Sequence, residues 1–111
     1  MKDWLTVCSM DDLVPQTGVC AKVNEDQVAI FYCERNEQLY ALSNYDPAGK
    51  ANVLSRGIIG SIEGAPYVAS PLYKHHFHLA DGSCLEDPAL QVKTYGVRTR
   101  EGQVQVAASD A

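Results

Sequence analysis

The 111-residue chain has neither the long hydrophobic runs nor the positive charge that several classes of protein require. No apolar segment approaches the roughly 20 residues of a membrane-spanning helix. The first residues, MKDWLTVCSMDDL, lack the basic and then long apolar regions of a signal peptide. Lysine and arginine number 9 against 14 aspartates and glutamates, so the formal net charge is −5. We therefore expect no membrane partner, no nucleic-acid partner and a cytoplasmic location.

Cysteine is scarce and widely spaced. Cys8, Cys20, Cys33 and Cys84 form no C-x-x-C pair, and no cysteine lies between Cys33 and Cys84. Since Cys20 and Cys33 lie within apolar segments, the pattern favours buried, reduced thiols, as is usual in a reducing compartment. A disulfide framework is the alternative, although a chain of this length buries enough surface to do without one.

The usual catalytic motifs are also missing. The chain has no glycine-rich phosphate loop, no G-x-S-x-G and no cysteine placed near a histidine as a nucleophile. We therefore expect no catalytic residue in this chain.

Short apolar, β-branched segments separated by turn residues make up most of the sequence. Their period of two predicts antiparallel strands. A single helical turn is expected at residues 9–13, with Ser9 as its N-cap and Asp12 three residues later. Residues 44–66, with four glycines and two prolines, predict a long loop region with a short strand near 57–59. The expected strands are 4–7, 19–23, 28–33, 39–42, 67–69, 77–79, 91–100 and 103–107. The sequence therefore predicts one all-β domain over residues 1–111, a sandwich or barrel with two protruding loops.

The only three histidines, His75, His76 and His78, lie within S-P-L-Y-K-H-H-F-H-L-A-D-G at residues 70–82. In a strand, His76 and His78 would share a face and could share a metal. A complete site needs further ligands, and the nearest cysteine, Cys84, follows the turn. We therefore favour a solvated basic patch with Lys74 over a metal site, and a contact with a partner is the third possibility.

The order of several motifs resembles the Rieske [2Fe–2S] domain. LYALSNYDP at 39–47, VLSRG at 53–57, SPLYKHHFHL at 70–79 and Asp81-Gly82 follow its pattern. The framework residues that agree are Ala41, Asn44, Pro47, Leu54, Ser55, Gly57, Pro71, Phe77, Leu79 and Gly82. The resemblance implies a Rieske-like antiparallel β-sandwich or barrel whose two protruding loops occupy the cluster-binding position.

The positions of the cluster ligands do not agree with that family. A Rieske centre uses two cysteine thiolates and two histidines, and the corresponding positions here are Asp46, Ala48, Ser70 and Tyr73. The resemblance therefore implies a domain without a cluster or any other cofactor. We expect Asp46 to accept a hydrogen bond from Tyr73 across the gap between the loops, with Ser70 available to join.

The combination of N-Y-D-P, V-L-S-R-G and S-P-L resembles the small-subunit family of bacterial NADH-dependent assimilatory nitrite reductases. This implies an accessory, non-catalytic role beside a large subunit that carries FAD, [4Fe–4S] and sirohaem and uses NAD(P)H to reduce nitrite to ammonia. The expected contacts with the large subunit are at the loop tips: Tyr45, Leu72, Tyr73, Lys74, His75 and His76. The alternatives are a Rieske-type electron-transfer ferredoxin and a stand-alone binding module.

Overall fold

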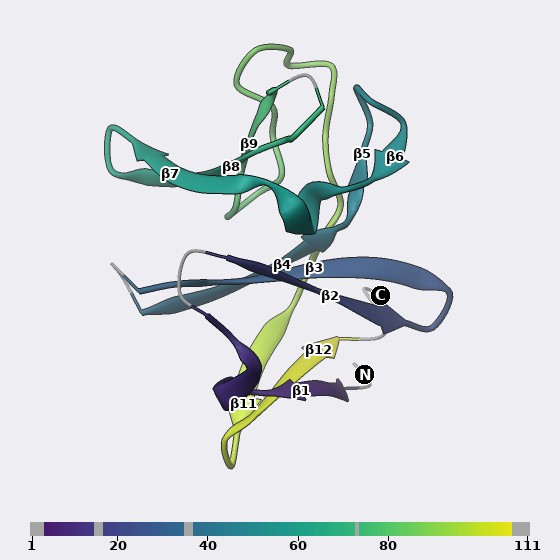
Figure 1. The fold of residues 1–111 in the computed structure, drawn as a ribbon, viewed down its shortest axis with the longest axis vertical. Coiled ribbons are helices and arrows are strands. Elements are labelled where there is room, and N and C mark those ends of the chain that lie inside the picture. The colour runs from purple at the N-terminus through teal and green to yellow at the C-terminus, as the bar shows by residue number, and fades with distance from the viewer. Residues whose placement is uncertain (1–3, 15–16, 35–36, 73, 108–111) are drawn as a thin grey trace.

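Strands dominate the computed structural model (Figure 1), which describes residues 4–14, 17–34, 37–72 and 74–107. Within these ranges there is no α-helix, and no helix is long and apolar enough to cross a membrane. The elements in chain order are β1 (Trp4–Ser9), η1 (Met10–Asp12), β2 (Gly18–Val23), β3 (Asp26–Cys33), β4 (Gln38–Ser43), β5 (Tyr45–Asp46), β6 (Ala51–Asn52), η2 (Leu54–Arg56), β7 (Ile58–Ile62), β8 (Ala65–Ala69), β9 (His76–His78), β10 (Thr94–Tyr95), β11 (Val97–Arg100) and β12 (Gln103–Ala107).

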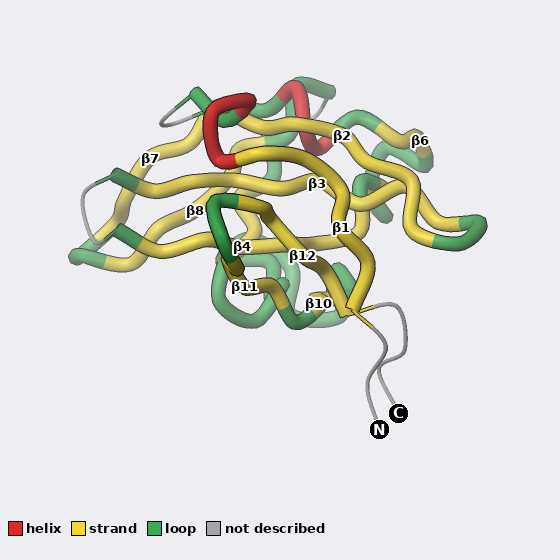
Figure 2. The backbone as a smooth tube through the Cα atoms, turned by 90° about the horizontal axis from the view of Figure 1, so that it is seen from below, coloured by secondary structure: helices red, strands yellow, loops and turns green. Residues whose placement is uncertain are grey.

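The strands form three layers with a four-stranded sheet, in the order β10-β4-β3-β2, at the centre. Figure 1 shows the sheet β1-β12-β11 on one side of it, and the sheet β7-β8-β9 with the β5–β6 hairpin on the other. Viewed from below in Figure 2, β1, β11 and β12 lie in front of this central sheet. Every pairing is antiparallel, and β1 pairs with β12 so that Trp4 lies opposite Ala107. The all-β prediction is therefore confirmed.

Strand β3 explains why layers form on both sides of the central sheet. Its successive side chains point to opposite faces, and four of them in a row are buried. Val28 and Ile30 enter the core toward β12, whereas Ala29 and Phe31 enter the core beneath β7–β9. A strand with two apolar faces needs cover on both, and this positions the upper layer that carries the loops.

Residues 91–100 do not form the single strand expected from the sequence. β10 pairs with β4 in the central sheet, whereas β11 pairs with β12 in the lower one. The chain changes sheet at Gly96, between the two strands. An alternating pattern predicts extended backbone but carries no information about which sheet a strand joins, so this prediction was wrong.

Residues 44–66 are more regular than predicted. Short strands β5 and β6 pair with each other, η2 follows, and β7 pairs with β8 over five residue pairs. The β7–β8 turn uses Glu63 and Gly64 at φ 53° and 85°. Gly60 inside β7 hid its alternation, so only its first part was expected from the sequence.

The remaining local expectations have mixed outcomes. Ser9 caps η1 through a bond from Asp11 N–H of 3.2 Å, and its own N–H donates to Asp12 Oδ2 over 2.9 Å, which confirms the predicted capping box. All four cysteines are free; Cys33 is buried as expected, Cys84 is also buried, and Cys8 is half-buried. Cys20 is exposed, because β2 is an edge strand of its sheet, so its predicted burial was wrong.

Candidate functional site: two facing loops

Two loops of the upper layer, residues 46–50 and 70–74, share one backbone design. In each, the N–H of the fifth residue donates to the carbonyl oxygen of the first, over 2.7 Å in the first loop and 3.1 Å in the second. The fifth residue is a lysine in both, and Lys50 and Lys74 adopt left-handed φ angles of 56° and 59°. The sequences D-P-A-G-K and S-P-L-Y-K therefore fold into similar turns.

The first side chain of each loop caps its own turn. Asp46 Oδ1 accepts from the N–H of Ala48 at 2.8 Å, and Ser70 Oγ accepts from the N–H of Leu72 at 3.3 Å. These are the local turns that aspartate and serine favour. The two caps also meet, because the Ser70 hydroxyl donates to Asp46 Oδ2. Asp46 is 0% exposed and Ser70 1%, so this bond joins the loops in a buried position.

Contact between the loops continues from this bond toward their tips. A β-carbon built on Gly49 would lie 2.4 Å from Leu72 Cδ1 and 3.1 Å from Asp46 Oδ2. Glycine is therefore the residue that lets Leu72 lie against the first loop. Leu72 is nevertheless 46% exposed, so one side of it packs and the other faces solvent.

The first loop is fixed at its base by Asn44, which is 2% exposed. Its Oδ1 accepts from the N–H of Ser55 at 2.6 Å. Its Nδ2 donates to Gln27 Oε1 at 3.1 Å and to the sulfur of Cys20 at 3.5 Å. One buried amide thus ties the start of the loop, η2 and the central sheet together, as buried polar groups must be satisfied.

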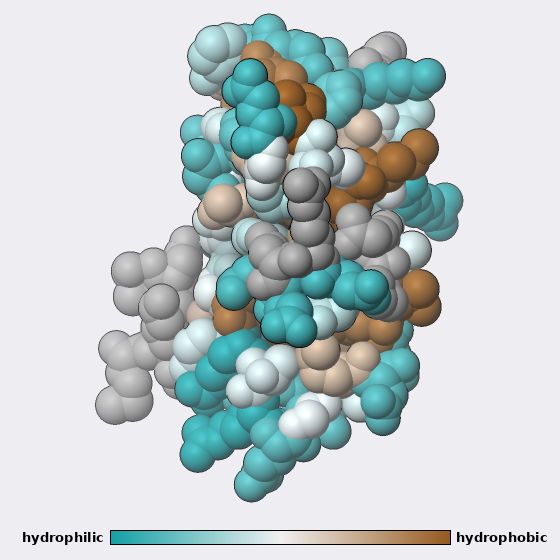
Figure 3. Space-filling model, turned by 90° about the vertical axis from the view of Figure 1, so that its left-hand side faces the viewer, coloured by the Kyte–Doolittle hydropathy of each residue, from teal (hydrophilic) through white to brown (hydrophobic). Residues whose placement is uncertain are grey.

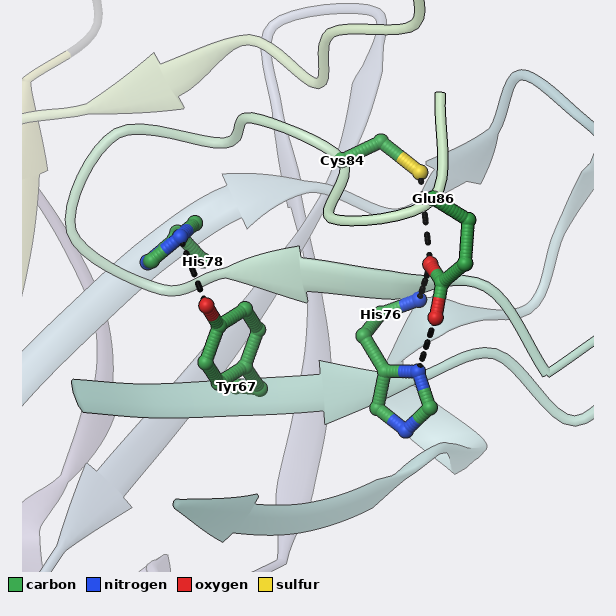
Figure 4. A network of polar contacts seen from close by, with 5 residues as sticks. All are labelled: Tyr67, His76, His78, Cys84 and Glu86. Carbon is green, nitrogen blue, oxygen red and sulfur yellow. Dashed lines mark hydrogen bonds and ion pairs between the residues drawn. The ribbon is translucent and has the colours of Figure 1, made fainter. Parts of the chain in front are cut away.

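The second loop is fixed from the side by Glu86 (Figure 4). Glu86 Oε1 accepts from the backbone N–H of His76 at 2.7 Å, and Glu86 Oε2 lies 2.5 Å from Nδ1 of the same histidine. Although burial opposes ionisation, these hydrogen bonds hold the pKa of Glu86 below its ordinary value. The Cys84 thiol donates to the same carboxylate at 3.6 Å, and burial raises its pKa. A thiol of that kind is a poor nucleophile.

His76 and His78 lie on one face of β9, as the sequence predicts, on either side of Tyr67 (Figure 4). The Tyr67 hydroxyl is 2.8 Å from His78 Nε2, and the ring centroids of Tyr67 and His76 are 6.3 Å apart. Each imidazole thus has a protein partner. Among the residues that the structure describes, no three His, Cys, Asp or Glu side chains form a group that could hold a metal ion.

The loops do not offer the ligand set of a Rieske cluster, which needs two thiolates and two imidazoles. Three of the four corresponding positions lie in the described residues: Asp46 and Ser70, joined by a hydrogen bond, and Ala48, which offers only a methyl group. His75 Nδ1 is buried with no hydrogen-bond partner in the described ranges. A single imidazole nitrogen in a loop without a thiolate does not complete the set, so the donors do not fit the cluster.

The expected partner contacts are placed as follows. Tyr45, at 42% exposed, Leu72 and Lys74 face solvent, whereas His75 and His76 are half-buried. Tyr73, and with it the expected Asp46–Tyr73 bond, lies outside the described residues. The expected hydrogen bond of Ser70 with Asp46 is present.

Sequence reasoning missed three functional candidates: Gly49, Lys50 and Glu86. The spacing shared by D-P-A-G-K and S-P-L-Y-K carries a signal for the first two, because both segments end in a lysine four residues after an Asp or Ser. Nothing in the sequence points to Glu86, which reaches His76 from ten residues away.

Comparison with known proteins gives a consistent result. The family model described as the Rieske-like [2Fe-2S] domain matches residues 3–107. The nitrite reductase (NADH) small subunit of Escherichia coli K12 is 46% identical over 96% of this chain and 98% of its own. The solution structure of a nitrite reductase [NAD(P)H] small subunit from Erwinia carotovora is 50% identical, with a TM-score of 0.79 over 97% of this chain and 83% of the other.

A third relative differs in length. The nitrite reductase [NAD(P)H] large subunit of Klebsiella oxytoca is 38% identical over 95% of this chain, but the match covers only 11% of the relative. That long chain therefore contains one segment that is similar to nearly all of the present chain.

Proposed function

The chain belongs to the Rieske-like family of nitrite reductase small subunits, and we propose that it is the accessory, non-catalytic subunit of a cytoplasmic NAD(P)H-dependent nitrite reductase. In this role it supports the reduction of nitrite to ammonia during nitrate assimilation. The observation that carries the proposal is the bond between Asp46 and Ser70. It closes the two loops directly where a Rieske domain holds a redox centre, and it leaves this chain a binding role rather than an electron-transfer role.

The Klebsiella oxytoca relative supports the large subunit as the partner. A segment similar to this chain is covalently part of that large subunit. A covalent link maintains a high effective concentration of one domain beside the other, so the arrangement is consistent with a domain that works in contact with the reductase. A separate chain must reach the same position through a binding surface.

We assign the redox chemistry to the large subunit, with FAD, [4Fe–4S] and sirohaem as its cofactors. The loops of this chain lack thiolates, and the thiol of Cys84 is buried with a raised pKa. The residues of this chain therefore bind and orient the large subunit, and neither nitrite nor NAD(P)H reacts on them.

The subunit role is tested by producing the chain together with the large subunit of the same organism, with an affinity tag on the large subunit. We expect the chain to co-purify, and we expect nitrite-dependent NADH oxidation to fall when it is omitted and to recover when it is added back. If the chain neither co-purifies nor changes that activity, the proposal is wrong.

The ferredoxin alternative is tested on the chain alone. Iron content and visible absorbance are measured after purification under anaerobic conditions. We expect a colourless protein without stoichiometric iron, since the donor set does not fit. A red-brown sample with two iron atoms per chain would establish the ferredoxin role instead.

A further inference from the structure

The tips of the two loops carry an isolated pair of cations. Lys50 and Lys74 occupy the same position in the two similar turns, and both side chains are exposed. Neither ammonium group has an ion-pair partner in the part of the chain that the structure describes. The chain as a whole has a formal net charge of −5, so this positive site stands out from an acidic molecule.

The two carboxylates that hold the loops in place are already engaged. Asp46 is fully buried and bonded to Ser70. Glu86, on the segment that fixes the second loop, is held by His76. The positive charge of the tips is therefore available to a partner.

An apolar centre accompanies the two cations. Leu72 lies against Gly49, the neighbour of Lys50, and exposes 46% of its surface. Tyr45 stands just before the first loop and is 42% exposed. An apolar centre with a charged rim is the usual composition of a protein interface.

The outer face of β7 is another exposed apolar region. Ile58 and Ile62 are 77% and 38% exposed there and border a hollow of about 190 Å³. Figure 3, which views the side where β7 lies, shows apolar residues as separate spots among polar ones. Isolated apolar residues are normal on a protein surface, and this hollow is lined by no lysine or arginine.

We propose that the tips of the two loops are the surface that docks on the reductase large subunit, and that the matching surface is an apolar pocket rimmed by carboxylates. This inference rests on the proposed function. Lys50 and Lys74 would meet the carboxylates and steer association, while Leu72 would enter the pocket.

The bond between Asp46 and Ser70 gives this surface its rigidity. It holds the first and second loops together before any partner arrives, so less conformational freedom is lost on binding. The same bond therefore joins the loops without a cluster and prepares them for binding.

The test compares the affinity of the large subunit for two double variants of equal charge. Lys50→Glu/Lys74→Glu reverses the charge of the loop tips. Lys22→Glu/Arg100→Glu reverses the charge at two exposed cations on β2 and β11. Glutamate suits the left-handed backbone, since Glu37, Glu63 and Glu101 adopt φ of 53–54° in this chain. We expect the tip variant to bind about 10- to 100-fold more weakly and the control within about threefold of the native chain.

Two further measurements separate charge from apolar contact. Leu72→Ala should weaken binding about tenfold, whereas Ile58→Ala, which shortens a more exposed residue on β7, should leave it unchanged. Raising the salt from about 0.05 to 0.5 M should weaken the native chain far more than the tip variant. Thermal unfolding checks that each variant folds. If the unfolding midpoint of Lys50→Glu/Lys74→Glu falls, the neutral variant Lys50→Gln/Lys74→Gln is used in its place.

The possible outcomes distinguish the two proposals. If the native chain does not bind the large subunit, the subunit role fails and the docking surface with it. If the native chain binds but the tip variants and Leu72→Ala bind equally well, the docking surface is wrong and the subunit role stands. Loss of binding in the Lys22/Arg100 control alone would place the interface on the central and lower sheets, at β2 and β11, and would overturn the proposal.

Discussion

The two loops of the upper layer have the same backbone turn but opposite side chains. The first loop offers an acceptor, Asp46, and a residue without a side chain, Gly49. The second offers a donor, Ser70, and a bulky residue, Leu72, that lies on that glycine. A metal cluster needs similar ligands from both loops, whereas a hydrogen bond needs a donor opposite an acceptor. Joining the loops without a metal therefore requires them to differ.

The largest effect is expected from removing the buried acceptor. Asp46→Ala leaves the buried Ser70 hydroxyl and the half-buried Ala48 N–H without their partner, and it should lower the free energy of unfolding by about 3 kcal/mol. Ser70→Ala should cost about 2 kcal/mol, and the double variant should cost clearly less than the sum because the residues are in contact. Chemical denaturation of the four proteins measures this coupling.

Asp81 provides a matched control, because it makes the same kind of bonds on the surface. Its Oδ1 accepts from the N–H and the hydroxyl of Ser83 at 2.9 and 2.7 Å, but Asp81 is exposed. Asp81→Ala should cost less than about 1 kcal/mol. Additive effects of Asp46→Ala and Ser70→Ala would contradict the direct contact between the loops.

A smaller effect should reveal the fit between the two loop tips. Gly49→Ala places a methyl group against Leu72 Cδ1, which can move because it ends a flexible side chain, so we expect a loss of about 1 kcal/mol. The same change should cost less in a Leu72→Ala background, where Cδ1 is gone and only the contacts with Asp46 Oδ2 at 3.1 Å and the β-carbon of residue 72 at 3.3 Å remain. Thermal unfolding of the single and double variants checks this. Equal losses in both backgrounds would mean that Leu72 does not determine the need for glycine.

Much of the fold could be predicted from the sequence, because its determinants are local. The alternation in β3 and the capping box at Ser9 depend on neighbours within a few residues, and both are found as expected. The division between β10 and β11 could not be predicted, since it depends on which distant strand each one pairs with. The exposure of Cys20 likewise depends on the place of β2 at a sheet edge.

The candidate site divides in the same way. Its positions could be identified from the order of motifs, including Asp46 and Ser70 where cysteines are needed. How these residues interact could not be deduced, since 24 residues separate the two partners and several side chains could meet Asp46. The side contact from Glu86 was missed for the same reason, as the segment that carries it has no recognisable motif.

The smallest effect concerns the contact of Glu86 with His76, which fixes the second loop from the side and has no described counterpart at the first loop. The hydrogen bonds from His76 lower the pKa of Glu86, so they stabilise the folded chain at pH above the ordinary value of 4.5, and this contribution is lost as the pH falls below it. Both side chains are more than a third exposed, so Glu86→Gln should cost only about 0.5 kcal/mol at pH 7. The difference from the native chain should shrink at a second pH below 4.5. A cost of Glu86→Gln that is the same at both pH values would mean that the second loop is held by the shape of the segment around Glu86, and not by its charge.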